Sequence, residues 1–288
     1  MKHACIRERV DRITKQLLNS DIEAVINDHY DLMMARYKLN PLFYKTLFKS
    51  DRYMVALALL SKFYSTKGMT LSVVRSFCEE RGYLSKNTLE SYFSFFLITK
   101  RMTIITHPSN GRLRVYEPSA QALAETKAIL DTHLLPLASL SMENLRFLTT
   151  SNSSCRSEHF LRGFAQLLDA RCTLDIIVPD AHWMLNRDGG YMLVLALYID
   201  MSKNRNEQGG YKSSTYAALS SLLCVSSTHL MRLVREGETR GYFKNHKNIV
   251  EVTPKFESFV RTMMACTFAI TLVSVELGEV QELGSFDE

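Results

Sequence analysis

Side chains of types that can form hydrogen bonds with bases or phosphates are concentrated between residues 226 and 247. A helix over 226–240 would bury Leu230, Leu233 and Val234, and its solvent side would present Ser227, Thr228, His229, Met231, Arg232 and Arg235. Arginine makes paired hydrogen bonds with guanine, and serine or threonine bonds to bases or phosphates. Lys244, His246 and Lys247 follow in a β-rich piece, where cations suit phosphate contact. The pattern favours contact with DNA over an ordinary solvated helix face.

A second polar set occupies a similar position earlier in the chain. A helix over 85–100 exposes Lys86, Asn87, Thr88 and Ser91, with Glu90 beside them, and the hairpin that follows holds Arg112 and Arg114. An acidic residue on such a helix repels phosphate, although it can accept a hydrogen bond from cytosine. The same helix carries many apolar residues. Direct DNA contact and a role in protein contacts alone therefore both stay open for this segment.

The two sets belong to an internal repeat. Tyr53 begins YMVALALL and Tyr191 begins YMLVLALY, and a proline stands twelve residues before each tyrosine. Downstream, LSKNTL matches VSSTHL, and VYEPSAQALAET matches EVTPKFESFVRT. The offsets are 138, 141 and 136 residues, so the matched blocks keep one order. Such self-similarity predicts two copies of one structural unit.

Each copy is predicted to contain the same series of elements. In the first, helices over 53–64, 70–81 and 85–100 precede two β-rich pieces, MTIIT and RLRVYE, joined by the turn residues HPSNG. Thr70 and Ser85 are expected N-caps, and Pro118 is expected to open a closing helix. The second copy has helices over 191–202, 213–223 and 226–240, the hairpin YFKNHKNIVEV, and a closing helix that starts at Thr253-Pro254. Helix, helix, turn, helix, hairpin, helix is the order of a winged helix-turn-helix domain.

The second copy resembles the MarR-type winged-helix transcription regulators. The resemblance rests on SSTHLMRLVREGETRGYFKN, which is similar to that family's recognition helix and wing, and on VTPKF after it. Gly237 stands where the family usually has leucine, and in the first copy Lys100-Arg101 replaces the usual glycine–aromatic pair. The resemblance implies a DNA-binding regulator with a small-molecule effector, for which no residue identifies a site. The family normally dimerises, so two units in one chain would imitate that dimer, and a homodimer stays open as well.

The predicted fold class is mainly α with small β-hairpin wings, as two tandem winged helix-turn-helix domains joined and flanked by helices. The predicted divisions are an N-terminal helical segment at 1–40, a first winged-helix domain with its closing helix at 41–148, a linker and helix at 149–178, a second winged-helix domain with its closing helix at 179–277, and an acidic tail at 278–288. The linker is placed at the stretch TTSNSS, whose small polar residues are typical of a loop.

Charge and cysteine usage narrow the class of protein. Residues 51–135 hold 11 Lys/Arg and 7 Asp/Glu, and residues 190–262 hold 10 Lys/Arg and 6 Asp/Glu, so each segment carries +4 while the rest of the chain sums to −3.

The six cysteines show neither CxxC spacing nor histidines at metal-finger spacing, so we expect no disulfide and no metal. The uncharged run TMMACTFAITLVSV is shorter than the ~20 residues of a membrane span and is expected in the core or an interface. The expected location is cytoplasmic, because the first residues hold no signal-type apolar run.

Motifs of enzyme active sites are missing from the sequence. It has no Gly-rich phosphate loop, nucleophile elbow or paired-histidine metal motif, so we expect neither catalysis nor a cofactor. His182 beside Trp183 is expected to be a packing or surface pair. The leading interpretation is a sequence-specific transcription regulator that binds double-stranded DNA. A plasmid- or phage-type replication initiator and a winged-helix protein-interaction adaptor are the alternatives, which salt dependence and target sequence would separate.

Overall fold

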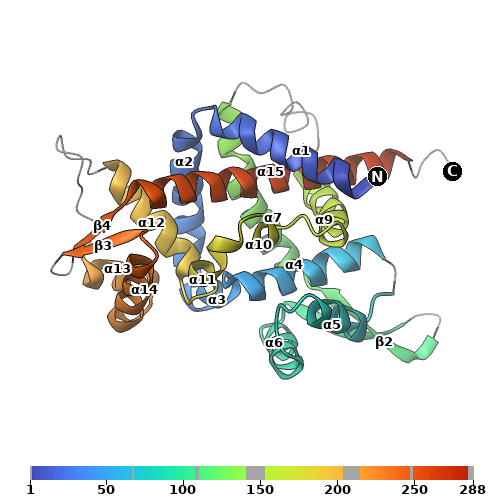
Figure 1. Ribbon diagram of the computed structural model, residues 1–288. Coiled ribbons are helices and arrows are strands. Elements are labelled where there is room, and N and C mark those ends of the chain that lie inside the picture. Colours follow the sequence, from blue (N-terminus) through green and yellow to red (C-terminus); the bar gives the residue numbers. More distant parts are fainter. Residues whose placement is uncertain are drawn as a thin grey trace.

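The computed structural model describes residues 2–66, 68–107, 110–140, 153–203, 215–246 and 249–284. Helices dominate this part of the chain, and its strands form two separate antiparallel pairs, β1–β2 and β3–β4 (Figure 1). The expected mainly α class with two small hairpins is therefore confirmed. Lys247 and most of the predicted linker TTSNSS lie outside the described residues.

The first half of the chain runs α1 (Lys2–Leu18), α2 (Ile22–Leu39), α3 (Pro41–Leu47), α4 (Ser50–Ser65), α5 (Leu71–Glu80), α6 (Lys86–Ile98), β1 (Met102–His107), β2 (Asn110–Pro118), α7 (Ala120–Leu134) and the 3-10 helix η1 (Pro136–Ser139). The second half runs α9 (Ser153–Asp169), α10 (Leu174–Ile177), η3 (Pro179–Ala181), α11 (His182–Leu185), α12 (Gly190–Lys203), α13 (Tyr216–Leu223), α14 (Ser227–Thr239), β3 (Phe243–His246), β4 (Ile249–Val252) and α15 (Pro254–Gly284). The series α4 to α7 and the series α12 to α15 therefore have the same order of helices and strands.

Side-chain caps explain where several helices begin. The Thr70 hydroxyl accepts a hydrogen bond from the Val73 amide (3.4 Å) at the start of α5, and the Ser226 hydroxyl accepts one from the His229 amide (3.2 Å) at the start of α14. Both satisfy amides that have no partner inside the helix. Ser85 precedes α6 as predicted but makes no such bond to the backbone.

The predicted place of Pro118 is wrong. Pro118 does not open α7; it ends β2, where it lies opposite Met102 in the ladder. The helix begins after Ser119, whose hydroxyl accepts a hydrogen bond from the Ala122 amide (3.2 Å). Proline tolerates the end of a strand because no ladder partner needs its missing N–H, and the serine cap then fixes the helix start two residues later.

Both hairpins are closed at the base by equivalent backbone bonds. The Ser119 amide donates to the Arg101 carbonyl (2.9 Å), and the Thr253 amide donates to the Tyr242 carbonyl (3.1 Å). The residue before each of these carbonyls takes a left-handed conformation, with φ of 57° at Lys100 and 77° at Gly241. The lysine in the first copy thus adopts the backbone shape that glycine supplies in the second.

Helix α15 crosses the molecule from the β3–β4 hairpin to α1 and forms its main packing axis together with α9 (Figure 1). Gly163 on α9 and Gly278 on α15 let the two backbones meet. A Cβ on Gly163 would stand 2.7 Å from the carbonyl carbon of Ser274, and one on Gly278 would stand 2.5 Å from that of His159. Real side chains do not fit at such distances, so only glycine permits this crossing.

The apolar run in α15 lies in the core, as expected. Met263, Met264 and Phe268 are fully buried. Among the described residues, Pro254–Gln281 is the one unbroken helix long and apolar enough to cross a bilayer, and 72% of its apolar window is buried inside the molecule. The predicted acidic tail is in part helical, because α15 continues to Gly284.

Helix α2 joins the two copies. The Tyr37 hydroxyl donates to the Leu223 carbonyl at the end of α13 (2.7 Å). His29 lies 2.7 Å from both the Thr132 carbonyl of α7 and the Tyr191 hydroxyl of α12. One continuous cluster of buried apolar side chains extends from Ile6 in α1 to α15. The segment at 1–40 is therefore part of a core that both copies share.

Candidate nucleic-acid interface

Helix α14 has a buried face and a cationic outer face. Leu230, Leu233 and Val234 are buried, as the spacing predicted. Arg232 and Arg235 are exposed, and neither forms a hydrogen bond or ion pair with any residue that the structure describes. Thr228 is exposed on the first turn of the same helix. These guanidinium groups are accessible to an anionic partner.

Two of the predicted contact residues bond to their own fold instead. The Ser227 hydroxyl donates to the Ser220 hydroxyl of α13 (3.2 Å). The His229 Nε2 lies 3.1 Å from the Asp188 carbonyl, so this nitrogen carries the proton and donates it. Both side chains are half-buried, and their bonds hold α14 against α13 and the turn before α12.

The β3–β4 hairpin packs under the end of α14. Phe243 is buried, and its ring occupies the space beside Gly237, where a Cβ would lie 2.5 Å from the Phe243 Cε2 and 3.1 Å from the Trp183 Cη2. Without movement of the Phe243 ring, a side chain larger than that of glycine does not fit at position 237. Lys244 is exposed and forms an ion pair with Glu251 across the hairpin (3.3 Å). The His246 backbone belongs to β3.

Helix α6 presents the first polar set. Lys86, Asn87 and Ser91 are exposed, and Thr88 is half-buried with its hydroxyl 2.9 Å from that of Ser85. The acidic neighbour Glu90 forms an ion pair with Arg75 of α5. This pairing offsets the negative charge that the sequence placed beside Lys86 and weakens the expected repulsion of phosphate.

The β1–β2 hairpin adds two exposed arginines. The Arg114 guanidinium donates to the Thr106 hydroxyl of the neighbouring strand (3.1 Å), which holds it along the hairpin. The side chain of Arg112 has no ion pair among the described residues. The hairpin therefore carries two accessible positive charges, matching the expectation from the sequence.

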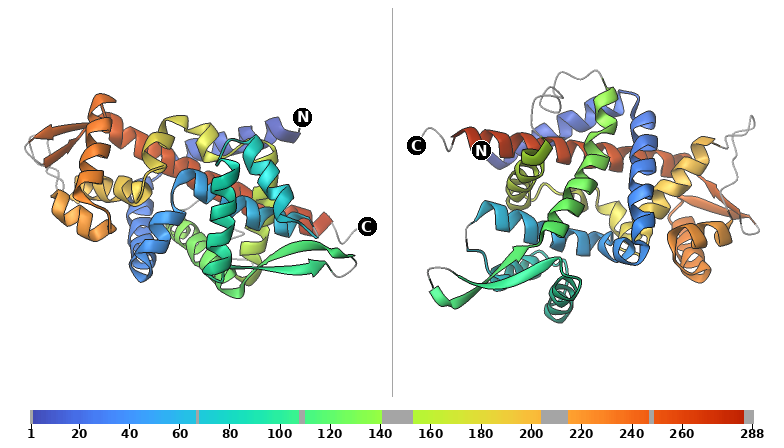
Figure 2. Two further views of the ribbon diagram at one scale, coloured as in Figure 1. Left: turned by 90° about the horizontal axis from the view of Figure 1, so that it is seen from below. Right: turned by 180° about the vertical axis from the view of Figure 1, so that it is seen from behind.

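Both polar helices lie on the same side of the molecule. Figure 1 shows α6 and α14 along the lower edge, and the view from below in Figure 2 shows both facing the viewer with α3 between them. The hairpins β1–β2 and β3–β4 lie at opposite ends of this side. The two copies thus present one helix each to a common surface, flanked outward by a hairpin.

Two lysines near α3, between the two helices, were not predicted from the sequence as part of this surface. Lys45 of α3 donates to the Cys224 carbonyl at the end of α13 (3.1 Å), and Lys49 pairs with Asp188 (2.8 Å). Burial alone would raise the pKa of Asp188, but Lys49, together with His229 and Lys45, holds it below its ordinary value. These lysines join the α3 region to the end of α13 and to the turn before α12, and their close spacing along the chain was the available signal.

Other predicted features are placed as follows. The His182 Nε2 lies 2.8 Å from an Asp51 carboxylate oxygen, and Trp183 stacks on Tyr242 with ring centroids 5.8 Å apart, so this pair packs at the surface as expected. Within the described ranges, no three His, Cys, Asp or Glu side chains gather at metal-binding distances.

No protein-family model, curated protein or solved structure matches this chain.

Proposed function

We propose that this chain binds double-stranded DNA sequence-specifically, as a transcription regulator built from two winged helix-turn-helix units. Helices α14 and α6 enter the major groove, and the two hairpins contact phosphates. The observation that carries the proposal is the presentation of both helices on one side, with a hairpin at each end (Figure 2). The shared order of elements and the equivalent hairpin closures support reading the two segments as units of one kind.

The positions of exposed cations also support this side of the molecule as the DNA-contact surface. Arg232 and Arg235 on α14, Lys86 on α6 and Arg112 on the first hairpin are exposed cations. Phosphate contacts supply most of the affinity of such proteins, whereas side chains that reach base edges supply the specificity. In this proposal α14 is the principal reading helix, because its two arginines can each bond a guanine.

The test is selection of bound duplexes from a random library, followed by titration of the selected sequence at several salt concentrations. We expect two half-sites in each selected duplex, because one chain presents two helices. Inserting five base pairs between them turns one half-site by about half a turn of the duplex and should reduce the affinity to that of a single half-site. An array of repeated sites would instead indicate an initiator that binds a replication origin.

Lys15→Ala provides a matched control for charge removal. Lys15 is exposed on α1, and this helix lies on the side of the molecule away from α6 and α14 (Figure 1). Its loss should leave DNA affinity unchanged, while Arg232→Ala should weaken it. Absence of any duplex binding, or binding with a flat salt dependence, would contradict the proposal and favour a protein-interaction adaptor.

A further inference from the structure

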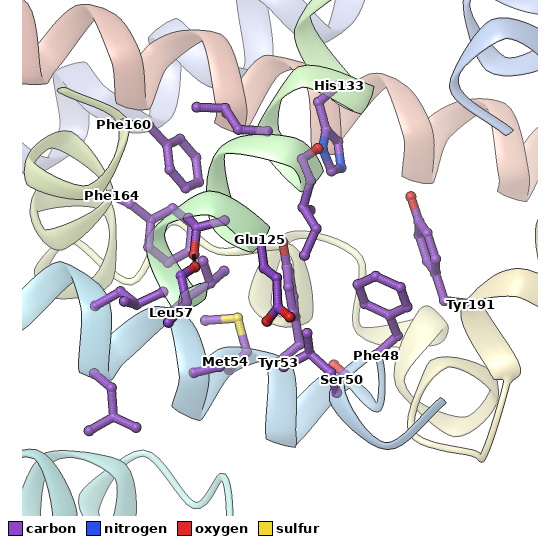
Figure 3. Close-up of a pocket in the computed structure, with 18 of the residues that line it drawn as sticks. Phe48, Ser50, Tyr53, Met54, Leu57, Glu125, His133, Phe160, Phe164 and Tyr191 are labelled. Carbon is purple, nitrogen blue, oxygen red and sulfur yellow. Dashed lines mark hydrogen bonds between the residues drawn. The ribbon is translucent and has the colours of Figure 1, made fainter. Parts of the chain in front are cut away.

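A cavity of about 180 Å³, partly open to the surface, lies between α4 on one side and α7, α9 and α15 on the other (Figure 3). It is larger than the ~150 Å³ apolar cavity that holds a benzene molecule in an engineered protein. Residues of both repeats reach it, because Tyr191 at the start of α12 lines one end. Protein interiors are otherwise close-packed, so a space of this size needs an explanation.

One end of the cavity is apolar. Phe160 and Phe164 of α9 have ring centroids 5.6 Å apart, and Leu57 and Met54 of α4 face them across the space (Figure 3). None of these side chains can form a strong hydrogen bond. This end is suited to a hydrocarbon ring.

The other end offers unused hydrogen-bonding atoms. The His133 Nδ1 lies 2.9 Å from the Ile129 carbonyl and must donate to it, which leaves Nε2 as an acceptor. His133 lines the cavity, is only 7% exposed, and has no second partner among the described residues. The Tyr53 hydroxyl also has no hydrogen-bond partner there. A buried acceptor without a donor is unfavourable, so a ligand that supplies one would be stabilised.

Among the other polar groups around the cavity, the Asp175 Oδ1 is buried without a hydrogen-bond partner among the described residues, and its negative charge also disfavours an anionic ligand, whereas Glu125 and Tyr191 are engaged. Glu125 accepts two hydrogen bonds from Arg101, at 2.8 and 2.7 Å, so its charge is balanced. The Tyr191 hydroxyl donates to the His29 Nε2, because the Nδ1 proton of His29 goes to the Thr132 carbonyl. Burial lowers the pKa of His133 to about 4, so this imidazole is neutral at pH 7. An anionic ligand would find no free counter-charge, and burying it would be costly.

We infer that this cavity binds a small neutral ring compound carrying one O–H or N–H donor, with the ring against Phe160 and Phe164 and the donor at the His133 Nε2. The inference stands apart from DNA binding, because it rests on the cavity and its unpaired acceptor alone. The proposed class of ligand excludes carboxylates and other anions.

The test uses three probes against the full chain in titration calorimetry at pH 7. Indole has a ring and one N–H donor, indene has the same shape without the donor, and benzoate carries a charge. We expect indole to bind with one site per chain, indene to bind roughly 2- to 12-fold more weakly, as loss of one hydrogen bond implies, and benzoate not to bind. Failure of indole to bind, equal affinities for indole and indene, or binding of benzoate would overturn the inference.

Two variants locate the probe. His133→Phe keeps a ring but removes the acceptor, so indole should then bind no more tightly than indene. Leu57→Trp fills the apolar end and should abolish binding of both. Ile98→Ala is the control, because Ile98 is 80% exposed on α6 and does not line the cavity. If His133→Phe retains the preference for indole, or a folded Leu57→Trp protein still binds it normally, the ligand lies elsewhere and the inference fails.

Discussion

Replacing Gly237 by alanine probes the contact that seats the second hairpin on α14. The added Cβ would stand 2.5 Å from the Phe243 Cε2, with Cδ2 closer still, and 3.1 Å from the Trp183 Cη2. Ordinary contact begins near 3.4 Å, so the Phe243 ring must move by about 1 Å. The ring has little room, since Phe243 is 1% exposed and packs on Phe256 with centroids 4.9 Å apart.

Two opposing effects set the size of the change in stability. Alanine favours a helix over glycine by up to ~1 kcal/mol. Overpacking a closed site costs about 1–3 kcal/mol. We therefore expect Gly237→Ala to lower the free energy of unfolding by about 1 kcal/mol, within a range of roughly 0–2 kcal/mol, although the same exchange at an open helical position would raise it.

The measurement is urea unfolding followed by circular dichroism. Gly111→Ala is the control, because Gly111 lies in β2 and a Cβ there meets nothing within 4 Å, so its midpoint should equal that of the parent or rise slightly. Adding Phe243→Leu to Gly237→Ala should recover part of the loss, so the two effects should not add. A Gly237→Ala protein more stable than the parent, or additive effects in the double variant, would refute this account of the hairpin contact.

Three further predictions concern DNA contact, pH and backbone strain. Arg232→Ala should weaken binding to the selected duplex by roughly 1–3 kcal/mol and relax base preference, and Lys86→Ala should weaken binding by less. Lys247→Ala should make the dependence of affinity on salt concentration shallower by about one unit of slope. Titrations in which only Lys86→Ala weakens binding would show that α6, and not α14, reads the bases. The pKa of His133 is lowered to about 4 by burial, so the unfolded chain, with an ordinary value near ~6.5, takes up the proton first. Its contribution is complete above pH ~6.5, and about 3 kcal/mol is lost as the pH falls toward 4. In urea unfolding at a series of pH values, His133→Phe should reduce this slope, and the remainder should come from His29, whose pKa is also lowered by burial. Lys100→Gly should raise the unfolding midpoint, by about 0.5–1 kcal/mol in stability, because Lys100 holds a φ of 57° that glycine adopts without strain; a lower midpoint would contradict this.

The element order was predictable because it depends on local signals. Thr70 and Ser226 are short polar residues placed directly before apolar, helix-spaced runs, and both cap helices in the structure. Pro118 shows how local rules compete. Proline suits the first turn of a helix and also the end of a strand, and the choice depended on the pairing of Pro118 with Met102, sixteen residues earlier.

Contacts between distant segments were beyond local reasoning. The cavity acceptor at His133 exists only because α4, α9 and α15 pack around α7, and nothing near residue 133 in the sequence signals it. The role of Gly237 likewise depends on where the Phe243 ring lies after the chain turns back. The ion pair of Glu90 with Arg75 joins two helices whose relative placement the sequence pattern did not define. The sequence was sufficient to name several candidate contact residues from their types. Whether each of their side chains is free or bonded to another residue could not be predicted from it.

The glycine crossing of α9 and α15 has a consequence for the order of events during synthesis. Gly163 meets Ser274, and Gly278 meets His159, and the residues of each pair are more than 100 positions apart along the chain. Helix α1, from the first residues of the chain, also packs against α15. A ribosome must therefore translate through α15 before the apolar faces of α1 and α9 can be covered. Until then the nascent chain exposes these faces to solvent, which is the condition that favours aggregation or chaperone binding. Folding of this protein should for that reason be completed after synthesis of α15 rather than one repeat at a time.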